Sequence, residues 1–205
     1  MNSAPGERHH DGGQQVSAEH DGGAMSDSQA VDDFAAVDAA VATLRSVRHF
    51  LPNPVPRVII EQAVDVARWT GSARNRQPWR FVAVTDPRLR AGLSRLGDYA
   101  QLLGRAPLVL VLLSQDNGYT DTEFDLGRIA QSICLVVHDR GLGTCLTTLH
   151  PDENVREAAE LLGVPDGWLP RHAIALGYTD ADNHRSPTAV PRGRLPVSEL
   201  LTWVP

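Results

Sequence analysis

Apolar residues recur at helical spacing in several stretches of the chain. Side chains three and four positions apart share one face of an α-helix, so this pattern predicts amphipathic helices. The predicted helices cover residues 31–44, 56–69, 87–96, 122–139 and 152–162. The residues expected to face the core in the first two helices are Val31, Phe34, Val37, Val41 and Leu44, and then Val58, Ile59, Ala63, Val66 and Ala67.

Four further stretches have the composition of strands, namely residues 80–85, 107–114, 143–149 and 171–178. The 107–114 stretch is an almost unbroken apolar run, which indicates a central strand covered on both faces. The 143–149 stretch fits either a strand or an extended loop. Helices and strands alternate too irregularly for a simple doubly wound sheet. Gly141 and Gly143 follow a helix instead of a strand, so we interpret Gly141 as a helix stop and not as part of a dinucleotide fingerprint.

The two ends of the chain have a different composition. Residues 1–30 are rich in Gly, His, Gln, Ser and Asp, which predicts a disordered tail, followed by one domain over residues 31–205. Residues 184–205 contain four prolines and show no clear period. Because a free tail rarely keeps large apolar side chains, we expect the last of them to dock on folded protein; these are Val197, Leu200, Leu201 and Trp203.

Charge and hydropathy argue against nucleic-acid and membrane partners. The formal net charge is −6, and hydrophobic residues make up 42% of the 205 residues, an ordinary globular value. The sequence has no long Arg block and no apolar run near the roughly 20 residues of a membrane helix. Its first residues lack the basic and apolar regions of a signal peptide. We therefore expect a cytoplasmic protein.

All 19 basic residues are arginine. The absence of lysine from the sequence excludes a Schiff-base lysine and a P-loop lysine. A bound phosphate would have to be held by arginine, a helix N-terminus or loop amides. The two cysteines, Cys134 and Cys145, lack the spacing of a zinc site, and we expect both to be reduced packing residues. No metal site is predicted.

The first polar cluster lies at residues 45–48, at the end of the first predicted helix. Arg45, Ser46 and Arg48 would grip a phosphate through charge-assisted hydrogen bonds. On spacing alone, it is at least as plausible that the arginines balance the dipole at the helix C-terminus. Arg192 and Arg194 form a basic turn near the other end of the chain. If the two clusters meet in space, four arginines would surround one phosphate monoester.

A second cluster, residues 71–79, is dense in hydrogen-bonding side chains. The amides of Asn75 and Gln77 offer donors and acceptors, which suits the edge of a heteroaromatic ring. The alternative is a solvated loop, with Trp79 in the core. No catalytic triad or poised carboxylate pair is evident, and the histidines lack motif context. A phosphate grip without acid–base machinery favours a protein that takes its chemistry from a cofactor.

These residues carry a resemblance to the nitroreductase family of flavoproteins. Residues 45–50, followed by Pro52 and Pro54, resemble the opening motif of that family. Residues 71–81 resemble its second signature, a Pro-Ser-x-x-Asn-x-Gln-Pro-Trp pattern. Residues 125–131 and 141–144 are similar to its central helix and the flavin-edge segment. The resemblance covers roughly residues 40 to 203 and keeps its order along the chain.

The resemblance implies an α+β fold with a central, mostly antiparallel sheet flanked by helices, in an interlocked homodimer with two FMN at the interface. Arg45, Ser46 and Arg48 would hold the FMN phosphate and ribityl chain, and Arg192 and Arg194 would close the phosphate pocket. The isoalloxazine contacts implied from the other subunit come from Ser72, Ala73, Asn75 and Gln77, and backbone amides around Thr147 and Thr148 would face flavin N5 and O4.

The sequence departs from the family pattern at three places. Gly71 stands for the usual Pro, Arg74 for a small residue, and Thr148-Leu149 for a frequent Gly-Gly. These departures concern the shape of the substrate pocket more than the binding of FMN. Arg74 is a candidate for stabilising negative charge at flavin N1 and O2, and the alternative, of equal weight, is that it points to solvent.

The activity implied is a ping-pong oxidoreductase. NADH or NADPH would give a hydride to flavin N5 and leave, and an electron-poor small molecule such as a nitroaromatic or a quinone would take the vacated face. Three alternatives remain: an FMN-binding storage or sensor protein with little turnover, a flavin-dependent dehydrogenase that runs in the oxidative direction, and a cofactor-free interaction protein whose arginines are surface charge.

Overall fold

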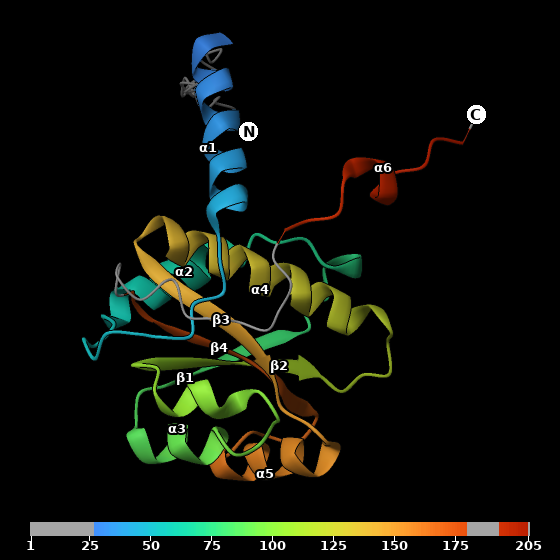
Figure 1. Ribbon diagram of the computed structural model, residues 1–205. Helices are drawn as coiled ribbons and strands as arrows, with labels where there is room; N and C mark the ends of the chain where they lie inside the picture. The colour runs from blue at the N-terminus through green and yellow to red at the C-terminus, as the bar shows by residue number, and fades with distance from the viewer. Residues whose placement is uncertain (1–26, 180–192, 205) are drawn as a thin grey trace, which may run out of the picture. The chain divides into compact units, whose positions relative to one another are not determined.

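The computed structural model describes residues 27–179 and 193–204, with side chains from residue 35 onward (Figure 1). By its internal contacts the chain divides between Val37 and Asp38 into two units, and the sheet and its helices belong to the second. Helix α1 (Asp27–Thr43) begins before the predicted residue 31. Val37 and Val41, on its predicted apolar face, are largely exposed. The predicted tail lies, up to residue 26, outside the described residues.

Four strands form one sheet in the order β1-β2-β4-β3, and all neighbours are antiparallel. The 143–149 stretch is therefore a strand and not a loop. β2 is buried at every position except its last, as its unbroken apolar run predicts. The strands are β1 (Trp79–Val84), β2 (Leu108–Gln115), β3 (Leu142–Thr148) and β4 (Trp168–Tyr178).

Helices cover both faces of this sheet (Figure 1). α2 (Arg57–Ala67) and α4 (Asp121–Asp139) pack on one face. α3 (Pro87–Leu93), α5 (Asp152–Leu162) and the 3-10 helix η2 (Ala100–Gly104) pack on the other. The predicted α+β class, with an antiparallel sheet and flanking helices, is confirmed. Two short helices complete the described chain, η1 (Ala73–Asn75) and α6 (Val197–Leu200).

The sheet separates two hydrophobic cores because side chains alternate across a strand. In β2, Leu108, Leu110 and Leu112 face the core under α2 and α4. Val109 and Val111 face the core under α3 and α5. Trp79 is only 8% exposed and belongs to the first core, as predicted. Both cysteines are buried and free.

The predicted core face of α2 was partly wrong. The buried residues are Ile60, Ala63 and Ala67, which follow the i, i+3, i+7 spacing of a single stripe. Val58 and Val66 lie off that stripe and are 53% and 50% exposed. A run of small and β-branched residues fits more than one helical face, and the contacts with α4 decide which face is buried.

The apolar side chains near the C-terminus are exposed in the single chain, Trp203 by 85%. Their docking therefore stays a prediction. Within residues 27–179 and 193–204, none of the helices has the length and apolar character that a membrane crossing requires.

Candidate functional site

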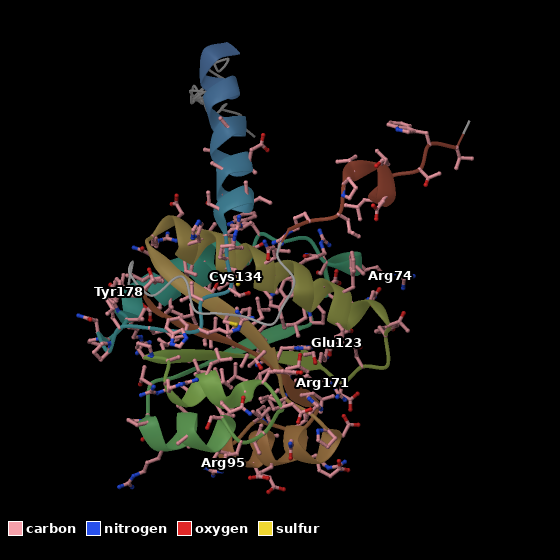
Figure 2. The ribbon with its side chains drawn as sticks, viewed as in Figure 1. Arg74, Arg95, Glu123, Cys134, Arg171 and Tyr178 are labelled. Carbon is pink, nitrogen blue, oxygen red and sulfur yellow. The ribbon has the colours of Figure 1, made fainter. Side chains whose placement is uncertain are left out.

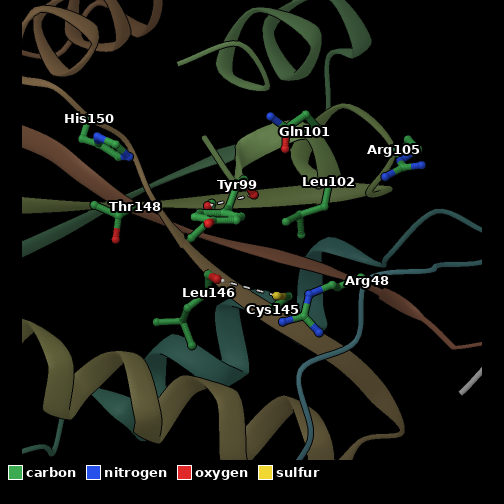
Figure 3. A pocket seen from close by; sticks show the side chains of 10 residues that line it. Arg48, Tyr99, Gln101, Leu102, Arg105, Cys145, Leu146, Thr148 and His150 are labelled. Atoms are coloured by element: carbon green, nitrogen blue, oxygen red, sulfur yellow. Dashed lines mark hydrogen bonds between the residues drawn. The ribbon is translucent and has the colours of Figure 1, made fainter. Parts of the chain in front are cut away.

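A hollow of about 450 Å³ opens beside β3, one of the two edge strands of the sheet (Figure 3). We call it the β3 pocket. Figure 3 shows Arg48 and Arg105 toward one side of it and Thr148 and His150 toward the other. Its lining residues are Arg48, Tyr99, Gln101, Leu102, Arg105, Cys145, Leu146, Thr147, Thr148 and His150.

Arg48 reaches the pocket because the segment before it pairs with β3. The amide of Val47 donates to the carbonyl of Thr144 at 2.7 Å, and Ser46 forms an isolated parallel bridge with the same residue. Gly143 makes this approach possible, because a Cβ there would lie 2.8 Å from the Cβ of Val47 and would also meet the Thr179 side chain. The second glycine of the Gly-Leu-Gly stretch is therefore required by close packing.

The two arginines of the first cluster have different environments. Arg45 turns back on α1, and its Nη1 donates to the carbonyls of Ala42 and Leu44 at 2.7 Å each. This is the helix-end interaction that spacing alone also allowed. The positive charge of Arg48 acts on the thiol of Cys145. Burial raises the pKa of this thiol, and the charge of Arg48 and a hydrogen bond with Ser46 lower it in part.

Residues 96–105 form the opposite wall of the β3 pocket. The amide of His150 donates to the carbonyl of Leu96 at 3.1 Å, and the hydroxyl of Thr147 donates to the carbonyl of Tyr99 at 3.2 Å. Tyr99, Gln101 and Arg105 were not predicted as site residues. No motif distinguishes them in the sequence, because only the folded chain brings this segment beside β3.

The pocket is electropositive. Its lining contains two guanidinium groups and no carboxylate. Among the described residues, neither Arg48 nor Arg105 takes part in an ion pair. An anionic ligand would therefore be favoured, with its charge toward the side that carries the arginines.

Residues 71–77 form a strained loop before β1. Arg74, Asn75 and Gln77 have φ angles of 52°, 53° and 50°, in the left-handed region that non-glycine residues rarely adopt. Such conformations persist only where neighbouring contacts hold them, and they concentrate at functional sites. Ser72 provides one such contact, because its hydroxyl accepts from the amide of Gln77 at 2.9 Å.

A buried carboxylate holds the start of this loop. Asp125 of α4 is 2% exposed, and its Oδ2 accepts from the amide of Ala73 at 2.8 Å. Arg128 lies 3.4 Å from its other oxygen. By its position in the sequence, Asp125 is an acidic residue near the N-terminus of α4, where negative charge favours the helix dipole. The fold gives it the further task of positioning the loop.

In the single chain, none of Ser72, Ala73, Asn75 and Gln77 lines the β3 pocket. Their predicted contact with a ring held by the other subunit stays a prediction. Arg74 is exposed, and Figure 2 shows it near the beginning of α4.

The predicted four-arginine pocket includes Arg192, which lies outside the described residues. Arg194 is exposed and donates to the carbonyl of Gly193 at 2.8 Å. Within the described part of the chain, no three His, Cys, Asp or Glu side chains are grouped to hold a metal ion.

Comparisons with known proteins agree with this architecture. The sequence model of the nitroreductase family matches residues 41–100 and 95–178. An NADH dehydrogenase of Thermus thermophilus is 34% identical over 212 residues, covering 82% of this chain and 96% of that protein. A 4-nitrobenzoate reductase of Pseudomonas putida is 42% identical over 66 residues, covering 32% of this chain and 28% of that protein.

Solved structures have the same fold as this chain. An FMN-dependent nitroreductase from Clostridium difficile superposes with a TM-score of 0.66 at 21% identity, covering 77% of this chain and 99% of that one. The family match spans well over half of the chain, and the Thermus relative is matched over nearly its whole length. The chain therefore belongs to the nitroreductase family of oxidoreductases.

Proposed function

We propose that this protein is an FMN-dependent oxidoreductase that uses NADH or NADPH to reduce an electron-poor small molecule, such as a nitroaromatic or a quinone. The observation that carries the proposal is the β3 pocket, where two arginines without an ion-pair partner among the described residues lie beside the edge of a strand. The similarity to a 4-nitrobenzoate reductase supports a nitroaromatic acceptor.

The chemistry of the pocket fits FMN. A volume of about 450 Å³ lies in the range of cofactor pockets. The phosphate monoester of FMN carries a charge of about −1.5 to −2 near pH 7, which suits the side with Arg48 and Arg105. Because β3 is an edge strand, alternate backbone groups of residues 145–148 face outward without a strand partner among the described residues. Such groups suit the polar edge of an isoalloxazine ring.

Each group of residues has a proposed task. Arg48, with Arg45 and Ser46, would hold the phosphate and ribityl chain, and Arg192 and Arg194 would close over the phosphate. The backbone around Thr147 and Thr148 would orient the ring, and the strained loop with Ser72, Ala73, Asn75 and Gln77 would border it from a second copy of the chain. Bound FMN would supply hydride transfer, with NAD(P)H and the acceptor reacting in turn.

A homodimer follows from the same proposal. Phe124 at the start of α4 and Leu146 in the β3 pocket are 69% and 46% exposed in the single chain. Exposed apolar side chains that border a hollow are typical of an interaction surface. A second copy would cover them and would bring its loop to the pocket. In this proposal residues 31–205 form one FMN-binding domain, preceded by a tail.

The test begins with the absorbance spectrum of the purified protein before and after addition of FMN, with riboflavin as the control ligand that lacks the phosphate. We expect flavin absorbance to be retained with FMN and much less with riboflavin. Arg48→Ala should weaken FMN binding roughly 10- to 100-fold, since a charge-assisted hydrogen bond contributes about 1.5–3 kcal/mol. Arg156→Ala, which removes an exposed arginine of α5, is the matched control.

Anaerobic oxidation of NADH and NADPH in the presence of a quinone or 4-nitrobenzoate then distinguishes an enzyme from a storage or sensor protein. A preparation that stays colourless after FMN is added would refute the proposal. A coloured protein that does not oxidise either nucleotide would favour storage or sensing.

A further inference from the structure

Three polar side chains from three different elements form a continuous hydrogen-bonded chain. The hydroxyl of Thr148, at the end of β3, lies 3.1 Å from Nδ1 of His172 on β4. The other ring nitrogen of His172, Nε2, lies 3.3 Å from a carboxylate oxygen of Glu123 on α4. None of the sequence motifs includes His172.

The fold brings these residues together on the α4 side of the sheet. Thr148 and His172 are directly opposite in the β3–β4 register, so their side chains share one face. Pro170, which has no N–H for the ladder, lies where the pairing of β2 with β4 shifts its register. Glu123 is in the first turn of α4.

The hydrogen-bonded series of Thr148, His172 and Glu123 connects two hollows. Thr148 lines the β3 pocket. Glu123 lines a second hollow over α4, beside Gly71 and Phe124. His172 and Glu123 are both partly exposed, so protons can exchange with water at this end.

The electrostatics favour an ionised Glu123. Its pKa is lowered, first by the hydrogen bond from His172 and then by a hydrogen bond with Ser114, against the effect of partial burial. Arg171 also lowers this pKa, although its guanidinium donates to Asp152 at 2.7 Å. The other acidic group in this turn of α4, Asp121, pairs with Arg76. The carboxylate of Glu123 is therefore an acceptor for Nε2–H.

When Nε2–H donates to Glu123, the protonation of Nδ1 determines whether the Thr148 hydroxyl donates to His172 or accepts from it. In the neutral imidazole Nδ1 is an acceptor, so the Thr148 hydroxyl donates its hydrogen to His172. In the imidazolium Nδ1 carries a hydrogen and donates to the Thr148 oxygen. The Thr148 hydrogen is then free to point into the β3 pocket.

We propose that Glu123, His172 and Thr148 form a proton-controlled switch that gives the β3 pocket a hydroxyl donor only when His172 carries its second proton. If a ligand takes the Thr148 proton, the Nδ1 proton moves to the Thr148 oxygen and His172 becomes neutral. One proton from water at the α4 side then restores the starting state. An acceptor that has gained a hydride needs one such proton, and this use rests on the proposed function.

The switch itself is tested without turnover, by ¹H–¹⁵N NMR of the histidine rings in the full-length protein as pH is varied. We expect neutral His172 in the Nε2–H form. Glu123→Gln should shift the Nε2–H resonances of His172, because an amide replaces the carboxylate that accepts from this group. Thr148→Val should change the Nδ1 resonance of neutral His172, and Thr148→Ser should restore it.

A matched control is available at His150, whose Nε2 lies 3.5 Å from a carboxylate oxygen of Asp98. Asp98→Asn should change the ring resonances of His150 and leave those of His172 unchanged. A neutral His172 in the Nδ1–H form, or His172 ring resonances that do not respond to Glu123→Gln, would overturn the switch.

The effect of the switch on the β3 pocket is measured as the FMN affinity above and below the midpoint, which is the pH at which NMR finds half of His172 in the doubly protonated form. Wild-type protein should bind FMN about fivefold more tightly below the midpoint, as expected for one hydrogen bond, and Thr148→Val should remove that difference. If FMN affinity depends on pH to the same extent in wild type and in Thr148→Val, the proposed role of the switch in the β3 pocket is overturned. A failure to bind FMN at any pH would contradict the proposed function instead, and the NMR result would still decide whether the switch exists.

Discussion

The β3 pocket and the strained loop at residues 71–77 are built in opposite ways. The wall of the pocket is a strand paired along its whole length with β4, from Leu142 to Thr148. The loop has three non-glycine residues in left-handed conformations, each costing about 1–3 kcal/mol, and depends on a few specific hydrogen bonds. The pocket wall is thus maintained by the cooperative sheet, whereas the loop geometry is maintained locally and is easier to change.

The largest expected effect comes from disturbing the wall itself. Gly143→Ala places a methyl group against Val47 and Thr179, and overpacking of this kind costs about 1–3 kcal/mol. The melting temperature should fall by roughly 2–4 °C per kcal/mol for a chain of this size. Gly127→Ala in α4 is the matched control, because a Cβ there meets nothing within 4 Å. Equal melting temperatures for the two variants would contradict the packing argument.

Removal of the buried carboxylate under the loop should have the next largest effect. Asp125→Ala leaves the amide of Ala73 without its acceptor, at a cost of about 1–3 kcal/mol. Hydrogen exchange should accelerate at Ala73 and its neighbours and stay unchanged in β3. Asp125→Asn keeps an acceptor oxygen and should lose less protection. Acceleration in β3 as well would mean that loop and wall are not independent.

A change that relieves the strain should have the opposite sign. Arg74 is exposed and has a φ of 52°, a conformation that glycine adopts without steric cost. Arg74→Gly should therefore raise the free energy of unfolding by about 0.5–1 kcal/mol. The same substitution inside α5, Arg156→Gly, should lower the free energy of unfolding by about 1 kcal/mol. Denaturant titration of both variants measures the contrast, and a loss of stability in Arg74→Gly would argue against strain in the loop.

The smallest effect expected is the pH dependence contributed by Glu123, which lies between the two regions. Its pKa is lowered in the folded protein, so its contribution is present above the ordinary value of 4.5 and is lost as pH falls through the lowered pKa. Glu123→Gln should reduce the loss of stability as pH falls below 4.5. Denaturant titrations across the acid range measure it. Asp152, whose pKa is also lowered, provides the comparison variant Asp152→Asn.

Local patterns were sufficient for elements whose surroundings the sequence itself reveals. The 152–162 helix was predicted with the bounds that α5 has, and the apolar run at 107–114 corresponds to β2, one of the two central strands. The same reasoning misjudged Val58 and Val66, because several faces of α2 are apolar enough to be buried. It also could not find η2 or the pocket residues on it, since residues 96–105 carry no period or motif.

The sequence by itself determined the α+β class, the strands and most of the helices, and the family, because periodicity and contiguous motifs are properties of neighbouring residues. Only the tertiary structure decided that Val47 lies on Thr144, that Tyr99 and Arg105 face β3, and that His172 joins Thr148 to Glu123. These contacts join residues far apart in the chain. They depend on strand register and helix packing, which no short stretch of sequence encodes.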